Sequence, residues 1–599
     1  MSGREYMTWH RIVATTPAKK KFDVRLVLDI ETWGLDATKL AVGVLGNVDT
    51  GVRRIFHTKE GYRLLLEEMR GENTVVYAHN GWRFDYLGLY DILEIKNAKK
   101  IDKRGRIILA IIDEVELRDF VALVPLSLSQ LGGKGVTPLK FLKGLEEEGV
   151  TDEDIAYCIQ DCDVLATAIR ELETLFAEWC DVTPGTIDLP LTAASMAYRV
   201  WCATAWPSHW RNPQGLGITF CDERFNDALD AAYSGGRTQL LCSPAALHTD
   251  VVALDRNSMF PAEMRDREFP DMSTCRQVLH SERNLRTLLA SNEVCTWADV
   301  DLCGGPPFLP NRDPDGRRCW DRSAFSGWLC GPEIAHALEI GYELEEIREI
   351  HYATAIHPFR AYVEKFYAMR REMLRQGDPR QVFVKLLLVS LYGKFGMRDI
   401  HERLESDEDI EEALNSGAFD QYTIGFYDGP LGELMYLESV LATRKASCQW
   451  FGFCAFTTSY ARVSLNRAIL AAGDDALYCD TDSLFLKQRS VPALLEEMTI
   501  GDDLGEWSWD VEEPADFVAW EPKAYVWMRD GEKFIVKHKG VTLRDHEGKL
   551  LPAAGDLTQD QQMRSVVLPR TAMRRGLRVG SGITTVKRSK RHHGKESPL

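Results

Sequence analysis

The segment Leu477–Phe485, Leu-Tyr-Cys-Asp-Thr-Asp-Ser-Leu-Phe, places two carboxylates at the tip of a predicted hairpin. Apolar residues on both sides predict two strands, with Asp480 and Asp482 in the tight turn between them. Carboxylates this close repel each other, so a divalent cation between them would stabilise the turn. A second predicted strand, Val251–Asp255, also ends in a carboxylate. An Asp-x-Asp tripeptide alone is more often a solvated turn, but two strand-end sites favour the paired metal ions of phosphoryl transfer.

A separate set of carboxylates lies in the first third of the chain. Asp29 and Glu31 end the predicted strand Arg25–Glu31 and share one of its faces, because side chains alternate along a strand. Asp85 follows the segment Tyr-Ala-His-Asn-Gly-Trp-Arg-Phe, and Asp161 lies in a predicted helix. Together these four residues form a candidate ligand set for two further metal ions.

The helix predicted around Asp161 carries a further candidate. Thr151-Asp-Glu-Asp resembles a capping box and predicts where this helix begins. Tyr157 lies one turn before Asp161 on the same face, where it would orient a metal-bound water. The ordered set of carboxylates and tyrosine is typical of a 3′–5′ proofreading exonuclease. Cys158 and Cys162 on this helix are interpreted as buried structural thiols.

In their order along the chain, these motifs resemble those of the family B DNA polymerases, over roughly residues 24 to 541. Lys385-Leu-Leu-Leu-Val-Ser-Leu-Tyr-Gly393 is close to the family's Lys-x-x-x-Asn-Ser-x-Tyr-Gly motif, and Lys523-Ala-Tyr525 follows late in the chain. The chain is similar in particular to the protein-primed branch found in terminal-protein phages and linear plasmids. Its short length, its Tyr233-Ser-Gly-Gly236 segment and the room for two insertions between motifs carry this narrower resemblance.

The resemblance implies an α/β and α+β multidomain fold. A ribonuclease-H-like 3′–5′ exonuclease domain, expected to be a mixed sheet flanked by helices, would precede a palm–fingers–thumb polymerase domain with two insertions. In relatives the first insertion binds the terminal protein, and the second encircles DNA and aids strand displacement. The expected boundaries are 1–190 for the exonuclease and 191–599 for the polymerase, with palm 233–264 and 451–522, first insertion 265–350, fingers 357–396, second insertion 397–450 and thumb 523–599.

The predicted fingers consist of two helical stretches separated by Gly377-Asp-Pro379, which breaks the helix. Gln381, Lys385, Val389 and Tyr392 fall on one face of the second stretch. The resemblance implies that Lys385 binds the incoming triphosphate and that Tyr392 forms a platform for its sugar and base, with core packing as the alternative for Tyr392. Val389 replaces the family's asparagine, which puts detailed base-pair checking in doubt.

Three more residues are assigned to the nucleotide. Arg370 on the first predicted helix is the second candidate phosphate contact. Ser258 and Phe260 lie in the motif that begins at Asp255, and Phe260 occupies the place of the family's usual tyrosine. A planar ring there would block a ribose 2′-hydroxyl, so we expect a preference for deoxynucleotides.

The DNA strands have their own candidates. Arg462, in Thr458-Ser-Tyr-Ala-Arg462, and Lys523 would neutralise primer phosphates. Lys537 is a further candidate for contact with DNA, and the alternative that it is a lysine on the solvent face of a strand explains it equally well. The exonuclease lysine maps to Lys140, with Lys143 as the alternative. The complete predicted DNA-binding set is Asn80, Ser127, Tyr233, Gly235, Gly236, Thr458, Arg462, Lys523, Tyr525 and Lys537.

Composition restricts the class of protein. A net charge of −18 argues against a passive, non-specific DNA binder, although a polymerase needs only a basic groove. The 14 cysteines include no C-x-x-C pair, and none lies after Cys479, which indicates reduced thiols in a cytoplasm and no zinc or iron–sulfur module at the C-terminus. The sequence contains no uncharged apolar run of about 20 residues, so we expect no membrane span. We expect a monomer in the cytoplasm of the host.

Taken together, the sequence predicts a template-directed DNA polymerase with proofreading. Asp255 and Asp482 would bind two Mg²⁺ ions, with Mn²⁺ as a substitute, and Asp480 would assist. The primer 3′-hydroxyl would attack the α-phosphate of a dNTP, and pyrophosphate would leave toward Lys385 and Arg370. The expected partners are DNA template and primer, dNTPs and a terminal protein. The alternatives are a nuclease with a degraded polymerase half and a non-catalytic DNA-clamping scaffold, and the intact carboxylates argue against both.

Overall fold

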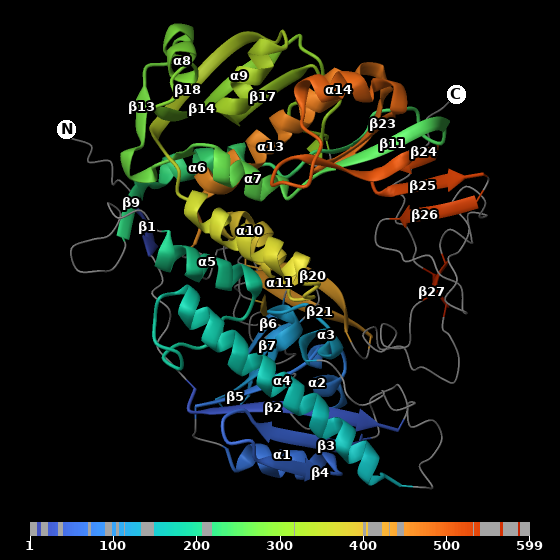
Figure 1. Cartoon of the computed structure of the whole chain (residues 1–599). Helices are drawn as coiled ribbons and strands as arrows, with labels where there is room; N and C mark the ends of the chain where they lie inside the picture. Colours follow the sequence, from blue (N-terminus) through green and yellow to red (C-terminus); the bar gives the residue numbers. More distant parts are fainter. Residues whose placement is uncertain are drawn as a thin grey trace, which may run out of the picture. The chain divides into compact units, whose positions relative to one another are not determined.

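The structure is a computed structural model of the chain (Figure 1). It describes residues 9–13, 22–33, 40–69, 73–89, 99–102, 107–112, 114–132, 149–205, 218–314, 316, 318–398, 403–404, 422–429, 432–439, 448–530, 532–538, 564–566 and 585–587. Contacts between residues divide the chain into two units. Unit 1 comprises residues 1–222, 357–450 and 570–578, and unit 2 comprises residues 223–356, 451–569 and 579–599.

A mixed seven-stranded sheet organises the N-terminal part of unit 1, as the sequence predicts. Its strands run in the order β4-β3-β2-β5-β8-β7-β6. The central strands β2, β5 and β8 are parallel, and the outer ones pair antiparallel. The central strands are almost continuously buried because both sheet faces are covered. The bounds are β2 Val24–Thr32, β3 Leu40–Asn47, β4 Arg53–Phe56, β5 Thr74–Ala78, β6 Lys99–Asp102, β7 Ile107–Ile112 and β8 Val115–Asp119.

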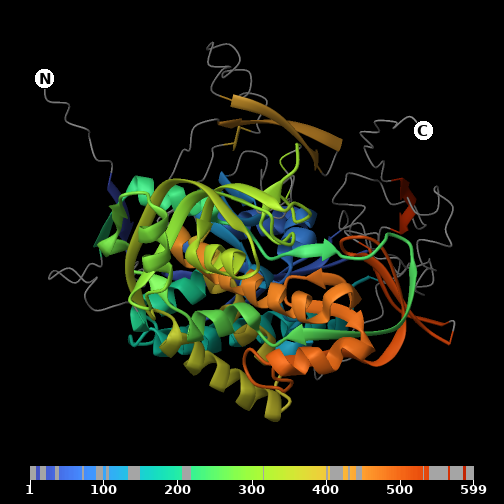
Figure 2. The ribbon, with the colours of Figure 1, turned by 90° about the horizontal axis from the view of Figure 1, so that it is seen from above.

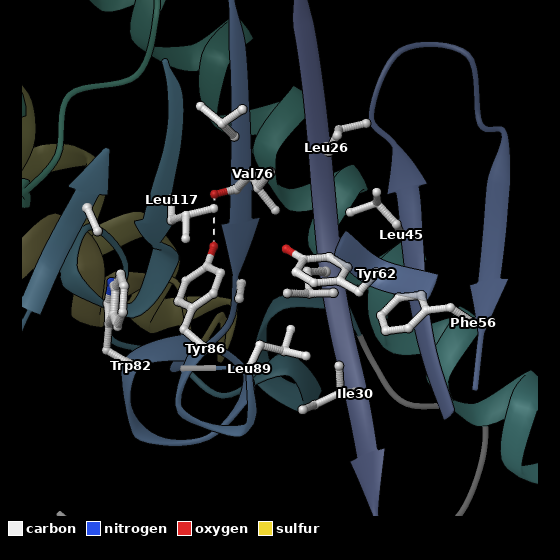
Figure 3. Packing of buried hydrophobic residues seen from close by; sticks show 14 residues of the cluster. Leu26, Ile30, Leu45, Phe56, Tyr62, Val76, Trp82, Tyr86, Leu89 and Leu117 are labelled. Atoms are coloured by element: carbon white, nitrogen blue, oxygen red, sulfur yellow. Dashed lines mark hydrogen bonds between the residues drawn. The ribbon is translucent and has the colours of Figure 1, made fainter. Parts of the chain in front are cut away.

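One face of this sheet carries a core of aliphatic and aromatic side chains (Figure 3). Helix α1 (Lys59–Glu67) contributes Tyr62, and the short helix α2 (Asp85–Gly88) contributes Tyr86. The Tyr86 hydroxyl donates a hydrogen bond of 2.9 Å to the carbonyl of Val76, so its polar end is satisfied inside the core. Tyr86 therefore anchors helix α2, which begins with Asp85, to the sheet.

The opposite face is covered by the long helix α4 (Asp152–Trp179), which contacts β2 and β3 (Figure 1). The predicted capping box is confirmed: Thr151 and Asp154 exchange side-chain and backbone hydrogen bonds. Cys158 and Cys162 are buried against the strands, and their thiols donate to backbone carbonyls. Both are therefore structural, as the sequence predicts, and every cysteine whose side chain is described is free.

Unit 1 also contains helices from the region predicted as fingers. The break at Gly377-Asp-Pro379 separates α10 (Arg360–Arg375) from α11 (Gln381–Phe395), as predicted. Helix α11 packs on α10 and on α5 (Ala193–Thr204). The remaining elements of the unit are η1 Gly81–Arg83, η3 Phe120–Ala122, α3 Leu128–Gly132, the pair β1 Trp9–Val13 and β9 Ile218–Asp222, and the three-stranded sheet of β19 Arg403–Leu404, β20 Tyr422–Gly429 and β21 Gly432–Ser439.

Aromatic contacts explain why these helices group with unit 1, although the sequence assigns residues from 191 onward to the polymerase. Trp179 at the end of α4 packs edge-on against Phe366 of α10. Trp201 of α5 contacts Phe359 and Phe395, and its indole donates a hydrogen bond of 2.8 Å to the carbonyl of Pro358. Large buried aromatic rings dominate such packing.

A second seven-stranded sheet, in the order β10-β22-β23-β11-β24-β25-β26, organises unit 2. Alternate residues of β11 face opposite sides: Val252 and Leu254 join the core under α13, whereas Val251 and Ala253 join an aromatic core with β24 and β25. The bounds are α6 Glu223–Ala232, β10 Thr238–Leu240, β11 Leu247–Arg256, α7 Met259–Asp266, α13 Phe451–Ala472, η7 Gly473–Asp475, β22 Ala476–Asp480, β23 Ser483–Lys487, η8 Gln488–Ser490, α14 Val491–Glu497, β24 Trp507–Glu521, β25 Ala524–Arg529 and β26 Glu532–His538.

The predicted palm–thumb boundary at residue 523 falls inside this sheet. Strand β25 pairs with β24, and β26 pairs with β25. Strands β25 and β26 therefore belong to the same sheet as the residues predicted to form the palm. Beyond them the structure describes one further pair, β27 Arg564–Val566 with β28 Thr585–Lys587.

The region predicted as the first insertion is an antiparallel sheet with its own hydrophobic core. Its strands run β12-β18-β14-β17, and β13 also pairs with β18. Two helices, α8 and α9, pack on strand β14. The bounds are β12 Phe269–Pro270, η5 Met272–Thr274, β13 Arg276–Val278, α8 Glu282–Leu289, β14 Val294–Cys303, β15 Asn311–Arg312, β16 Arg318–Cys319, β17 Ala324–Cys330, α9 Gly331–Glu339 and β18 Glu343–Ile356. Within the described residues, no helix is long and apolar enough to span a membrane.

The core in Figure 3 yields a stability prediction. Leu117 on β8 is fully buried, whereas Leu64 on α1 is 50% exposed. Leu117→Ala should lower the free energy of unfolding of this part of the chain by about 3 kcal/mol, because it leaves a cavity. The matched control Leu64→Ala should change it by less than about 0.5 kcal/mol. Urea unfolding curves would measure both, and equal shifts would contradict the assigned core.

Candidate active sites

The acidic turn of unit 2 is built as the sequence predicts, with β22 and β23 joined by Thr481 and Asp482. Thr481 has a positive φ of 67°, and the Asp482 amide donates a hydrogen bond of 2.8 Å to the carbonyl of Asp480. Strand β11 pairs with β23 so that Asp255 lies opposite Ser483. The Arg256 amide donates to the carbonyl of Asp482 at 2.8 Å. Residues 227 positions apart in sequence, Asp255 and Asp482, are thus brought to neighbouring backbone positions at one sheet end.

Thr238 and Lys523 both contact the side chain of Asp480. The Thr238 hydroxyl donates a hydrogen bond of 2.9 Å to its Oδ1, and the Lys523 Nζ lies 3.1 Å from the same oxygen. Lys523 follows β24, has a positive φ of 64°, and donates its backbone amide to the Tyr478 hydroxyl at 3.1 Å. The lysine predicted to contact primer phosphate therefore neutralises one carboxylate of the turn. Its side chain remains half exposed.

The four carboxylates of unit 1 influence one another strongly. Burial, followed by repulsion from Asp85, Glu31 and Asp161, raises the pKa of Asp29 well above its usual range. Burial also raises the pKa of Asp85, which accepts a hydrogen bond of 3.1 Å from the Ile30 amide. Asp29 Oδ2 is buried and has no hydrogen-bond partner. An orphaned carboxylate oxygen surrounded by like charges fits a divalent cation, which would relieve both costs.

In the described part of the chain, no group of three or more His, Cys, Asp or Glu residues forms a ready-made metal site. The metal ligands of both sites accordingly remain predictions.

The other exonuclease candidates occupy the same edge of the sheet. Tyr157 and the buried Asp161 lie one turn apart on α4. Asn80 follows β5 with a positive φ of 63°, and its amide donates 2.9 Å to Asp119 Oδ1. Sequence reasoning missed Asp119, which is buried at the end of β8 and also raises the pKa of Asp85. Its position after a buried strand was the available signal.

Of two further predicted exonuclease residues, the structure describes Ser127 but not Lys140. Ser127 is exposed just before α3, and its hydroxyl hydrogen-bonds with Ser129 and Gln130. Lys140 and its alternative Lys143 lie outside the described residues.

The predicted nucleotide face of α11 is the less buried side of that helix. Lys385 is exposed, and Gln381, Val389 and Tyr392 are partly buried. The opposite side, Phe383, Val384, Leu387, Leu388, Leu391 and Phe395, packs in the interior. Arg370 on α10 lies beside this face, with its Nε 3.4 Å from Gln381 Oε1, and partial burial lowers its pKa. In unit 2, Ser258 and Phe260 lie at the start of α7, three and five residues after Asp255, and both are partly buried.

Three predicted primer-strand residues are buried, which does not agree with direct contact to DNA through their side chains. Thr458 is inside α13, where its hydroxyl donates to the carbonyls of Cys454 and Ala455. Arg462 is 1% exposed and forms an ion pair with Glu333. Tyr525 packs among Tyr478, Phe485 and Phe517. Sequence motifs and their spacing identified these positions. They could not show that the surrounding helices and strands bury the side chains.

The remaining predicted DNA contacts are placed as follows. Gly236 is close to the acidic turn: an added Cβ would lie 2.6 Å from Thr481 Cγ2, so glycine permits this approach. Gly235 is exposed with open space around it, and Tyr233 packs near Phe451. Lys537 is exposed, with its Nζ 5.8 Å from the centre of the Tyr525 ring.

Comparison with known proteins agrees with this arrangement. Residues 137–431 match the model of the family described as "DNA polymerase type B, organellar and viral". A probable DNA polymerase of Agaricus bitorquis is 24% identical, over 87% of this chain and 76% of the relative. The DNA-directed DNA polymerase of Enterobacteria phage PRD1 is 25% identical, over 80% of this chain and 78% of the relative.

The fold has a solved counterpart. The structure of Phi29 DNA polymerase in an orthorhombic crystal form is similar with a TM-score of 0.65, covering 94% of this chain and 99% of that one at 16% identity. Its ternary complex with primer-template DNA and incoming nucleotide gives a TM-score of 0.63 at 15% identity, covering 90% and 95%. With carboxylates paired at a sheet end, a family model that matches residues 137–431 and relatives aligned over 80% and 87% of this chain, the chain is a DNA polymerase that is similar to the type B enzymes of organelles and viruses.

Proposed function

We propose that this polymerase copies a phage, plasmid or mobile-element genome with strand displacement, starts on a protein primer and proofreads its product. The observation that carries the polymerase chemistry is the register that brings Asp255 beside Asp482. Two divalent cations, Mg²⁺ or Mn²⁺, would supply charge stabilisation at the attacking and leaving oxygens. Asp255 and Asp482 would hold them, and Asp480 would hold the turn to Lys523 and Thr238.

The comparisons support DNA and deoxynucleotides as the partners. The related Phi29 polymerase has been captured with primer-template DNA and with incoming nucleotide. Lys385 and Arg370 are our candidates for binding the triphosphate, since both are cationic and lie on or beside one face of α11. Half-exposed Lys523 and exposed Lys537 are the candidates for contact with strand phosphates.

Proofreading rests on the carboxylates around Asp29. Its orphaned oxygen and raised pKa support a cation-dependent hydrolytic site held by Asp29, Glu31, Asp85 and Asp161. Tyr157, one turn before Asp161, would orient the attacking water. Protein priming rests on resemblance to terminal-protein polymerases and on the folded sheet that includes residues 265–350, our candidate docking surface for the primer protein.

The two activities should separate by mutation, because the two carboxylate sets are on different sheets. Asp29→Ala with Glu31→Ala should abolish excision of a mismatched 3′ end and leave extension intact. Asp482→Ala should do the reverse. Primer extension and excision on one labelled DNA would measure both. A folded variant that lost both activities would contradict the two-site assignment.

Sugar discrimination should depend on Phe260, at the start of α7 close to Asp255 in sequence. Phe260→Val removes the ring, so use of ribonucleotides relative to deoxynucleotides should rise by at least about tenfold, equivalent to about 1.4 kcal/mol. Phe260→Tyr retains the ring and serves as the control. Single-nucleotide insertion kinetics would measure the ratio, and an unchanged ratio in Phe260→Val would place the sugar gate elsewhere.

Strand displacement should depend on the segment between α11 and α13, which includes the hairpin β20–β21. Replacing residues 399–447 with a short Gly/Ser bridge should preserve gap filling on a primed single strand. Synthesis through duplex DNA should stop near the fork. Product lengths on the two templates would be compared, and equal displacement synthesis by the shortened protein would refute this role.

A further inference from the structure

A buried ion pair in unit 2 connects the region predicted as the first insertion to the palm. Glu333 on α9 and Arg462 on α13 both have fully buried side chains, with Arg462 Nε 2.8 Å from Glu333 Oε1. The two helices lie side by side (Figures 1 and 2). Arg462 Nη1 also donates to the backbone carbonyls of Ser234 and Gly235. Arg462 therefore fixes the segment that sequence analysis assigned to DNA.

A second polar connection runs parallel to the first. Arg237 Nη1 donates a hydrogen bond of 2.7 Å to Asn466 Oδ1, and the side-chain amide nitrogen of Asn466 lies 3.0 Å from His336 Nε2. Asn466 follows Arg462 by one turn of α13, and His336 follows Glu333 by one turn of α9. The same two helices thus hold residues 234–237 at two levels, both buried.

The held segment reaches the catalytic turn directly. The Thr481 amide donates a hydrogen bond of 2.7 Å to the carbonyl of Arg237. Gly236 lies against the Thr481 side chain, and Thr238 donates to Asp480. A continuous series of short contacts therefore leads from Glu333 through Arg462 and residues 234–238 to the turn that carries Asp480 and Asp482.

Stability alone explains this arrangement poorly. A buried ion pair carries a desolvation cost that its attraction often fails to offset, and apolar replacements of similar volume are frequently neutral or stabilising. Here Glu333 Oε2 and Arg462 Nη2 are buried without hydrogen-bond partners, which adds to the cost. The directional bonds of the guanidinium to two carbonyls provide what an apolar pair would not, namely a fixed position for the backbone.

We propose that Glu333 and Arg462 are positioning residues for nucleotide transfer: they hold residues 234–238 so that the Asp480–Asp482 turn keeps its catalytic geometry. Neither touches the reacting atoms. The region of α9 then supports the polymerase site itself, in addition to any docking of a primer protein. The proposal rests on the polymerase activity, so wild-type protein that fails to extend a primer would refute that activity and not this role.

Glu333→Gln tests the proposal, with Glu282→Gln on α8 as the control, because Glu282 is exposed and pairs with Arg286 one turn along the same helix. In Glu333→Gln the rate constant kcat for single-nucleotide insertion should fall by about 10²-fold, the cost of a small misplacement of reacting groups. The KM for dNTP should stay within about twofold. Glu282→Gln should behave as wild type.

Hydrogen–deuterium exchange supplies a readout independent of activity. The Thr481 amide should exchange at least about tenfold faster in Glu333→Gln than in wild type, while amides of β14 remain protected. Exchange that accelerates equally in both regions would indicate general destabilisation and overturn the positioning role. Unchanged exchange at Thr481 would overturn it as well.

A double variant separates position from stability even if Glu333→Gln folds poorly. Glu333→Leu with Arg462→Met replaces the pair by apolar side chains and should preserve the melting temperature. Because the donors to the two carbonyls are gone, it should still show the low kcat and the fast exchange at Thr481. Wild-type kcat and exchange in this variant would refute the proposal.

Discussion

Repulsion between carboxylates is the constraint on which the rest of this structure depends. A polymerase site needs several negative side chains within reach of the same cations, and such side chains move apart unless the backbone holds them. The chain meets this need by placing them at strand ends. Strand register in a buried sheet is strongly specified, because a shift of one residue would turn every side chain to the wrong face.

The two sheets apply this solution differently. In unit 1 the parallel strands β2, β5 and β8 end at the same edge, so Asp29, Asp119 and the segment before Asp85 gather there. Because that site is buried, ionising its carboxyl groups costs free energy, as the raised pKa values of Asp29 and Asp85 indicate. In unit 2 antiparallel strands bring Asp255 and the acidic turn together, and the turn is half open, with Lys523 neutralising Asp480.

The interior behind the polymerase turn is unusually polar. Arg237, Arg462, Glu333, His336 and Asn466 are all nearly inaccessible to solvent. Burial lowers the pKa of Arg237 and of His336, which shows the cost of placing such groups there. Hydrogen-bond directions specify where a backbone lies, whereas apolar packing tolerates sliding. The site therefore has rigid polar support, although apolar packing would have a lower desolvation cost.

The sequence by itself determined the chemistry and most of the elements. Carboxylates following apolar runs predicted the strands of Asp29, Asp255 and Asp480, and local signals such as the Thr151 capping box and the Gly377–Pro379 break set helix ends. These features are local, since propensity, caps and periodicity act over a few residues. Order along the chain then related the motifs to a polymerase family.

Tertiary structure alone decided which motif residues face solvent and which support others. Arg462 reads in sequence as a phosphate contact, but α9 supplies Glu333 from 129 residues away and encloses it. The sequence separates strands β25 and β26 from the predicted palm, yet they pair into the same sheet as its residues. Asp119 became part of the exonuclease edge through strand order. Burial, register and partner identity depend on long-range contacts, which a one-dimensional pattern does not contain.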